Sequence, residues 1–208
     1  MIDQINLPLI LIAAFLATAS PGPATLAIAG TSMNSGRKHG LALASGVMTG
    51  SLIWSISAAF GLGAIMLANS WLFEAVRYFG ACYLVYLAYK SARSALTAAP
   101  PTTSTTAVKS LRGAYAKGLM LHLTNPKAIL FFGSLYSIGI PANASPEALI
   151  YVIAAIAVQS FLLFHGYALL FSSKKITMGY AKLRRWFETV FALAFGAAGI
   201  KILTTPLD

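Results

Sequence analysis

The sequence predicts an all-α integral membrane protein whose six transmembrane helices form two inverted three-helix repeats. Of the 208 residues, 58% are hydrophobic and only 10% are charged, whereas a soluble domain carries about 25% charged residues. The apolar residues form continuous runs and do not alternate with polar ones, which favours helices over the strands of a closed barrel. Lys and Arg are concentrated in every second connection between these runs.

Each apolar run is close to the ~20 residues that a helix needs to cross ~30 Å of hydrocarbon. The first run lacks the pattern of a cleaved signal peptide, because the residues before it contain no Lys or Arg and include Asp3. The apolar stretch also continues past Ala19, where a cleavage site would lie. In chain order, the predicted spans are residues 7–30, 40–67, 71–91, 115–139, 147–171 and 186–204.

The basic residues give these spans a direction. Twelve of the fifteen Lys and Arg fall in the first, third and fifth connections, and the second and fourth connections contain none. By the positive-inside rule, the three basic connections are cytoplasmic and both termini are periplasmic. These connections account for most of the net charge of +10. No basic cluster alternates with aromatic residues that stack on bases, so we expect no nucleic-acid partner.

The chain divides into two halves of three spans each. Residues 1–96 form the first predicted repeat, residues 97–112 a flexible cytoplasmic linker rich in Pro, Thr and Ser, and residues 113–208 the second repeat. Short stretches match between the halves, such as TASP in the first span and LTNP in the fourth. Because three is odd, the second half crosses the membrane in the opposite sense, as in many secondary transporters. Chance similarity is the alternative for matches this short.

Proline interrupts the first and fourth spans, at Pro21-Gly22-Pro23 and at Pro126. A proline removes an amide donor, and the freed backbone groups are tolerated at membrane depth only against protein or a water-filled cavity. The ends of an interrupted helix carry about half a unit of charge each, positive at the amides and negative at the carbonyls. Such a pair suits a zwitterion; a kink that only shapes helix packing is the alternative.

Lys127 directly follows the second break. A lysine at the centre of a membrane helix costs about 2.5–3.5 kcal/mol on insertion scales, so a protein or substrate partner is expected. If the fourth span is shifted, Lys127 lies near the cytoplasmic interface instead. The predicted substrate-binding residues are Thr18, Ser20, Pro21, Gly22, Pro23, Thr25, Asn125, Pro126 and Lys127.

Three residues are candidates for carrying a coupling proton: His122, His165 and Lys127. Imidazole titrates near neutral pH, which suits this role, but each histidine is equally compatible with ordinary packing. The sequence has one cysteine and no cluster of metal-ligating residues, so we expect no metal site, no cofactor and no catalytic residue.

Three further features carry structural predictions. Glu188 is expected to pair with Arg184 or Arg185 at the inner face. Cys82, inside an apolar run, is expected to be a small buried hydrophobe. The GxxxG stretch at residues 46–50 would let the second span approach another helix closely, and it fits either folding or dimerisation.

The chain resembles the lysine-exporter (LysE) family and lies nearer its homoserine and threonine exporter branch. The resemblance covers nearly all 208 residues, including the six-span layout. The stretches that carry it are ATASPGPATL, SMNSGRKHGLALASGVMTGSLIW, FGACYLVYLAYKSARS and LTNPKAILFF.

This resemblance implies an inner-membrane secondary transporter that exports amino acids and is driven by the proton gradient. Its expected partners are a small amino-acid substrate, the lipid bilayer and, in a possible homodimer, a second copy. Many relatives carry Asp or Asn directly after the PGP motif, whereas this chain has Ala24-Thr25. The missing acid disfavours lysine and arginine as substrates and favours neutral or small polar amino acids.

Two other classes of protein are alternatives to an exporter. A permease or channel for another small solute or a metal ion is the first alternative, although metal transport favours Cys, Met or carboxylate clusters. An intramembrane enzyme is the second, and it would need a nucleophile–base pair or a carboxylate dyad at membrane depth. No acidic residue lies in the middle of a predicted span, so an enzyme is not expected.

Overall fold

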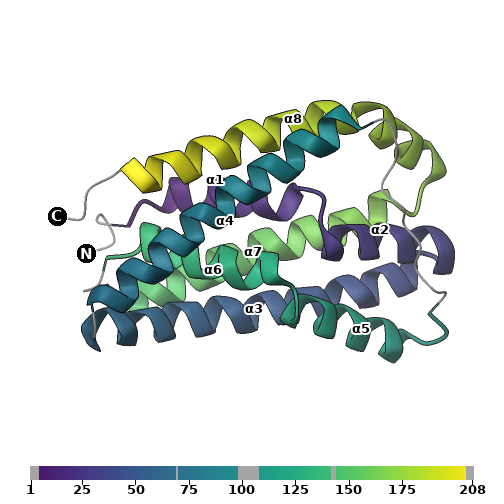
Figure 1. Cartoon of the computed structure of the whole chain (residues 1–208). Helices are drawn as coiled ribbons and strands as arrows, with labels where there is room; N and C mark the ends of the chain where they lie inside the picture. Colours follow the sequence, from purple (N-terminus) through teal and green to yellow (C-terminus); the bar gives the residue numbers. More distant parts are fainter. Residues whose placement is uncertain (1–4, 69, 98–107, 142–143, 205–208) are drawn as a thin grey trace.

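The computed structural model of this chain describes residues 5–68, 70–97, 108–141 and 144–204. Within these residues, eight helices run roughly along one bundle axis (Figure 1). They are α1 (Leu7–Ala19), α2 (Pro23–Ser35), α3 (Arg37–Ala68), α4 (Ser70–Leu96), α5 (Leu111–Leu123), α6 (Pro126–Gly139), α7 (Pro146–Leu170) and α8 (Lys174–Thr204).

Both predicted helix breaks are confirmed. The segment between α1 and α2 bends the chain by 51°, and the segment between α5 and α6 consists of Thr124 and Asn125. Both α2 and α6 begin with a proline at their first position. Proline is tolerated there because the first amides of a helix have no partner within the helix. The prolines therefore end one helix and start the next.

Two of the described helices are long and apolar enough to cross a membrane, Arg37–Gly61 within α3 and Pro146–Leu170. The bent pair of α1 and α2 adds a third if the pair is one span. The other predicted spans are helical, but within the described residues none of them is both long enough and apolar enough to count as a membrane span. The six-span arrangement therefore stays a prediction.

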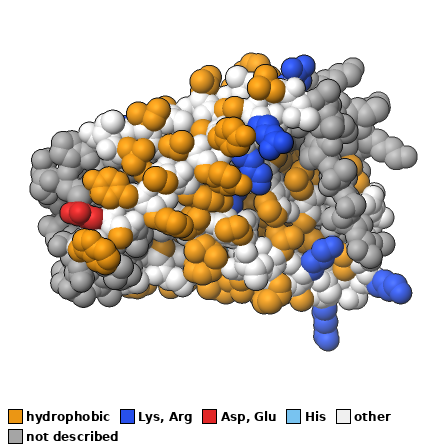
Figure 2. Space-filling model, in the orientation of Figure 1, with side chains coloured by type: hydrophobic (Ala, Val, Ile, Leu, Met, Phe, Trp, Pro, Cys, Tyr) orange, Lys and Arg blue, Asp and Glu red, His pale blue; other side chains and the backbone are white. Residues whose placement is uncertain are grey.

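The helix ends that carry most of the Lys and Arg gather at one end of the bundle. The start of α3, the end of α4, the start of α5 and the start of α8 lie together there, and the start of α1 and the end of α8 lie at the other end (Figure 1). Hydrophobic side chains cover much of the visible face, and the basic side chains lie toward the first end (Figure 2). This distribution matches the predicted alternation of the connections. The largest difference in boundary is at α8, which begins at Lys174, well before residue 186, so much of the fifth basic connection is helical.

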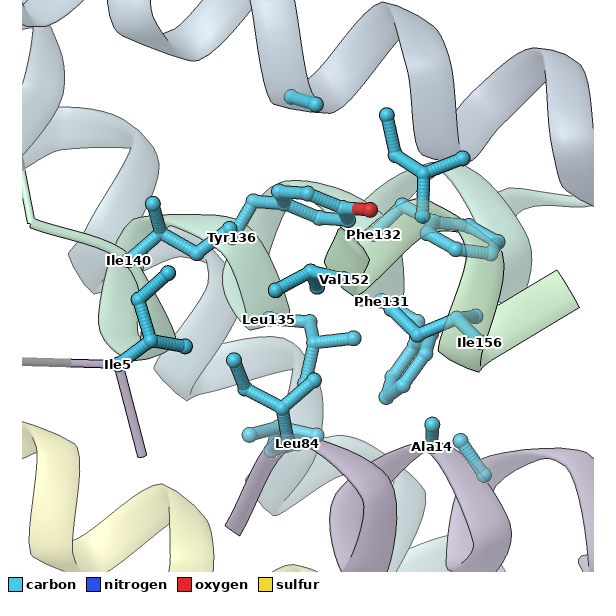
Figure 3. Packing of buried hydrophobic residues seen from close by; sticks show 14 of the residues in the cluster. Ile5, Ala14, Leu84, Phe131, Phe132, Leu135, Tyr136, Ile140, Val152 and Ile156 are labelled. Carbon is cyan, nitrogen blue, oxygen red and sulfur yellow. The ribbon is translucent and has the colours of Figure 1, made fainter. Parts of the chain in front are cut away.

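Two hydrophobic clusters form the interior. The larger cluster joins α1, α3, α4, α6, α7 and α8. Figure 3 shows Leu84, Leu135 and Val152 of this cluster pointing toward one another. The smaller cluster joins α2, α3, α5 and α7 around Ile28 and Leu43. The clusters lie on opposite sides of the helix breaks, because α1 and α6 belong to the larger one and α2 and α5 to the smaller one.

Glycines bring α3 and α5 into close contact. A Cβ atom on Gly46 would collide with the carbonyl oxygen of Tyr115, and one on Gly118 would collide with the carbonyl oxygen of Leu43. A Cβ on Gly50 would lie 2.9 Å from the Cβ of His122. Both glycines of the GxxxG stretch are thus used within the chain, and the motif gives no support to a homodimer.

Two side chains lie differently from the sequence predictions. Cys82 is exposed, not buried. Glu188 is buried, with 4% of its surface exposed, and it accepts a hydrogen bond from the Ser94 hydroxyl at 2.9 Å. The predicted partner Arg185 instead donates from its Nε to the carbonyl oxygen of Ala95 at 2.8 Å, and the described residues show no ion pair between it and Glu188. The Arg184 side chain is outside the described residues.

Candidate functional site

Hydroxyl groups replace the amides that are lost at the first break. Its two prolines remove the donors that would have bonded to the carbonyls of Ala17 and Ala19. The Ser20 Oγ donates to the Ala17 carbonyl oxygen at 3.0 Å. The Tyr167 Oη, which comes from α7, donates to the Ala19 carbonyl oxygen at 2.7 Å. Both carbonyls are therefore satisfied, one locally and one from a distant helix.

Thr25 fixes the backbone at the start of α2 with its side-chain hydroxyl. The Gly22 N–H donates to the Thr25 Oγ1 at 2.9 Å, and the Thr25 hydroxyl lies 3.1 Å from the Gly22 carbonyl oxygen. The amides in the first turn of α2, including that of Ala24, have no acceptor within the helix. This helix end carries a partial positive charge.

The second break is satisfied by its own residues. Pro126 removes the amide that would have bonded to the His122 carbonyl, and the Asn125 N–H donates to that oxygen at 3.2 Å. The Asn125 Oδ1 accepts from the Lys127 N–H at 3.0 Å and so caps α6. Lys127 is thereby fixed in the first turn of α6, with its side chain free to reach across the break.

Lys127 joins the two breaks. Its Nζ donates to the Ser20 carbonyl oxygen at 3.3 Å and also to the Ser20 Oγ. A Cβ on Gly22 would lie 3.4 Å from this Nζ, which is ordinary van der Waals contact, so the Gly22 backbone lies directly beside the ammonium group. The Phe195 ring centroid on α8 lies 5.9 Å from Nζ, within the range of a cation–π interaction. The half-buried ammonium group is therefore held by backbone, hydroxyl and ring, as expected for a lysine inside a bundle.

A pocket lies beside this contact, between the two hydrophobic clusters. Its empty volume is ≈ 500 Å³, and part of this volume is open to the outside. Ala14, Phe131 and Ile156 contribute to its wall from the larger cluster, where Figure 3 shows them near one another. Ala24 and Phe164 contribute from the smaller cluster. The pocket thus forms where helix breaks interrupt both clusters.

Seven of the residues singled out from the sequence line this pocket. Pro21, Pro23 and Pro126 are not among the lining residues; they form the breaks that create the pocket. The seven lining residues are Thr18, Ser20, Gly22, Thr25, His122, Asn125 and Lys127.

His165 lies apart from the pocket. Its Nε2 is 3.0 Å from the Ser45 Oγ, and its Nδ1 is 2.9 Å from the Phe161 carbonyl oxygen. The ring also lies against the ring of Phe161, with the centroids 4.2 Å apart. Both ring nitrogens are therefore satisfied within the protein.

Sequence reasoning missed several lining residues. Ser51 of α3 and Ser160 of α7 bring hydroxyl groups into the pocket, and Phe131 and Phe132 of α6 bring rings. Tyr167, which completes the first break, was also missed. Single serines and aromatic residues in an apolar run carry no distinguishing signal, because such residues are common in membrane helices.

The pocket combines one positive charge with uncharged polar groups. Lys127 is the charged side chain among the lining residues, and no carboxylate is among them. The ammonium group and the first amides of α2 suit an anionic group. Backbone carbonyls and serine hydroxyls suit a cationic group of a small ligand. The arrangement therefore fits a small zwitterion.

Comparison with known proteins gives the family. The family model described as LysE type translocator matches residues 15–205. The threonine efflux protein of Escherichia coli (strain K12) is 29% identical over 191 residues, which cover 90% of this chain and 92% of that protein. The leucine efflux protein of Enterobacter sp. (strain 638) is 32% identical over 162 residues, which cover 74% of this chain and 76% of that protein. No solved structure matches the chain. The chain therefore belongs to the LysE type translocator family, as its helix-break motifs predict.

Proposed function

We propose that this protein is a secondary transporter that exports neutral amino acids across a bacterial inner membrane. The observation that carries the proposal is the Lys127 ammonium group, which lies at the junction of two broken helix pairs and lines a pocket without a carboxylate. A neutral amino acid brings one carboxylate and one ammonium group, and the pocket offers partners for both. A cationic side chain would add a second positive charge beside Lys127, which is unfavourable at this depth.

The proposed pose places the substrate carboxylate between Lys127 and the first amides of α2. In this pose the carboxylate replaces the bonds that Lys127 now makes to Ser20. The substrate ammonium group lies toward the end of α1, where the helix carries a partial negative charge. The side chain lies against the apolar wall formed by Phe131, Phe132 and Ile156.

The relatives support this substrate class. The two efflux proteins described above are named for threonine and leucine, which are both neutral amino acids. The family as a whole is described as translocators. These names, together with the absence of a carboxylate among the lining residues, favour a neutral substrate over lysine or arginine.

The proposal includes a membrane arrangement. The pairs α1 with α2 and α5 with α6 each act as one broken span, and α3, α4, α7 and α8 complete six spans in two inverted repeats. The end of the bundle that carries the basic residues faces the cytoplasm, and both termini are periplasmic. The proton gradient drives export, and one proton entering through 100 mV supplies about 2.3 kcal/mol. A hundredfold gradient of a neutral solute costs about 2.7 kcal/mol, so one or two protons suffice.

Counterflow in proteoliposomes tests the proposal directly. Vesicles that contain the purified protein and an unlabelled neutral amino acid should accumulate the same labelled amino acid, while empty vesicles should not. Lysine, arginine and glutamate serve as charged competitors and should exchange poorly. If no amino acid exchanges at any pH gradient, or if lysine exchanges best, the proposal is wrong.

A further inference from the structure

His122 lines the pocket with both ring nitrogens unsatisfied. The side chain is 5% exposed, and neither Nδ1 nor Nε2 has a hydrogen-bond partner among the described residues. Buried polar groups are normally hydrogen-bonded, so two unpaired nitrogens on one imidazole in the pocket lining call for an explanation. The contrast with His165, whose two ring nitrogens are both within hydrogen-bond distance of protein oxygens, shows that the bundle can satisfy a histidine.

The ring is held in place by packing and not by hydrogen bonds. Its edge meets the Phe164 ring, with the centroids 5.9 Å apart and the planes at 76°. Gly50 packs against the same side chain, because a Cβ there would lie 2.9 Å from the Cβ of His122 and 3.3 Å from its Cδ2. A fixed ring with free nitrogens is suited to binding a ligand that enters the pocket.

The charged surroundings of His122 are simple. Lys127 of α6 is its electrostatic neighbour, and the α3 and α7 residues that share the pocket, Ser51, Ser160 and Phe164, are uncharged. A neutral imidazole offers one acceptor nitrogen, whereas an imidazolium offers only donors. The substrate ammonium group can donate only, and the pocket lining contains no carboxylate to receive it.

We infer that His122 accepts a hydrogen bond from the substrate ammonium group and that a proton competes with the substrate for the same ring nitrogen. This inference rests on the proposed function, and it assigns one of the three proton-coupling candidates a direct role in binding. The charge of Lys127 opposes protonation of His122, so the proton binds only when the substrate has left or at acidic pH. A proton that adds to this nitrogen removes the acceptor and leaves a positive charge facing the ammonium group, so the substrate leaves. No bond other than the N–H bond forms or breaks. Substrate binding from the cytoplasm and proton binding from the periplasm then alternate, which is antiport.

Two substitutions of His122 separate its hydrogen bond to the substrate from its binding of a proton. His122→Gln keeps an acceptor and a donor but cannot take up a proton. Its counterflow should fall less than that of His122→Leu, and its half-saturating substrate concentration should no longer depend on pH. In the wild type, one competing proton weakens binding by up to about tenfold per unit of pH. His122→Leu removes the acceptor and should reduce counterflow at every pH. The matched control is His165→Gln, which should keep the wild-type pH profile.

Proton release from the wild type gives a second measurement that needs no variant. Addition of the transported amino acid to protein in weakly buffered detergent at acidic pH should release protons, and the His122→Gln protein should release none. If the wild type exchanges amino acids but releases no proton, or if His122→Gln keeps the full pH dependence, this inference is wrong while the proposed function stands. If the wild type exchanges no amino acid, the proposed function itself fails.

Discussion

The two helix breaks solve the same problem in different ways. At the α5–α6 break, the lost donor is replaced locally, because the Asn125 amide bonds to the His122 carbonyl and the Asn125 side chain caps α6. At the α1–α2 break, one freed carbonyl depends on Tyr167 from α7, and the Ser20 carbonyl is occupied by Lys127. The second break is therefore self-contained, whereas the first depends on other helices for its partners.

This difference indicates that the two breaks have different roles. The self-contained break is fixed by local hydrogen bonds and positions Lys127. The dependent break supplies backbone groups whose partners are exchangeable, and a substrate that binds Lys127 has to displace the Ser20 contact. Irregular backbone at membrane depth is tolerated where it lines a cavity, and the first break fits that rule.

The largest effect is expected from removing the group that connects the breaks. Lys127→Met should lower counterflow by about 10- to 100-fold, because a hydrogen bond to a charged group contributes about 1.5–3 kcal/mol and each 1.4 kcal/mol is tenfold. Lys109→Met, at an exposed lysine before α5, is the matched control and should transport normally. Size-exclusion profiles of both variants should match the wild type. Wild-type rates in Lys127→Met would remove the ammonium group from the mechanism.

The next largest loss of transport is expected from replacing the prolines of the first break, compared with the proline of the second. The double change Pro21→Ala and Pro23→Ala returns amides to the Ala17 and Ala19 carbonyls and should straighten the 51° bend, with a loss of transport of about tenfold or more. Pro126→Ala should have a much smaller effect, because Asn125 supplies both the amide donor to the freed carbonyl and the cap of α6, so no partner from another helix is displaced. Transport rates of the reconstituted variants make the test. Equal losses at the two sites would mean that the breaks do not differ as described.

A smaller effect is expected from the hydroxyl that supports the first break from outside. Tyr167→Phe leaves the Ala19 carbonyl without its donor, which should cost about 1–3 kcal/mol of stability and lower the melting temperature of the purified protein. Pro23→Ala restores an amide to the same carbonyl, so the loss should shrink in the Tyr167→Phe, Pro23→Ala double variant. Strictly additive losses would show that the tyrosine acts elsewhere.

The smallest effect concerns the cap of the second break. Asn125→Ala removes the side-chain acceptor for the Lys127 amide and should cost about 1 kcal/mol, the usual value for an N-cap. Asn125→Asp and Asn125→Ser keep an acceptor and should stay near the wild-type melting temperature. A large loss of transport with unchanged stability in Asn125→Ala would instead indicate direct contact with the substrate.

The breaks could be predicted from single residues because proline acts locally. Pro21, Pro23 and Pro126 cannot donate a backbone hydrogen bond in any context, so each one interrupts a helix wherever the helix lies. Lys127 could be singled out for a similar reason, since an ammonium group in a bilayer needs a partner. That partner is Ser20, which lies 107 residues away along the chain, so only the structure could identify it.

The residues that complete the site could not be predicted, because lipid and protein interior are both apolar. In a soluble protein, a polar face and an apolar face tell which side of a helix is buried. In a membrane helix both faces are apolar, so Cys82 was wrongly expected to be buried, and nothing distinguished Ser51 or Tyr167 from other polar residues in apolar runs.

The sequence by itself determined that this chain is helical, apolar and broken at two places, because composition and proline act on each segment separately. Only the tertiary structure decided that the two breaks meet, that Tyr167 replaces one lost amide and that His122 lies buried with both nitrogens free. The physical reason is that these contacts join helices far apart in the chain. Such pairings depend on the shape and spacing of side chains across an interface, which hydropathy along a single helix does not record.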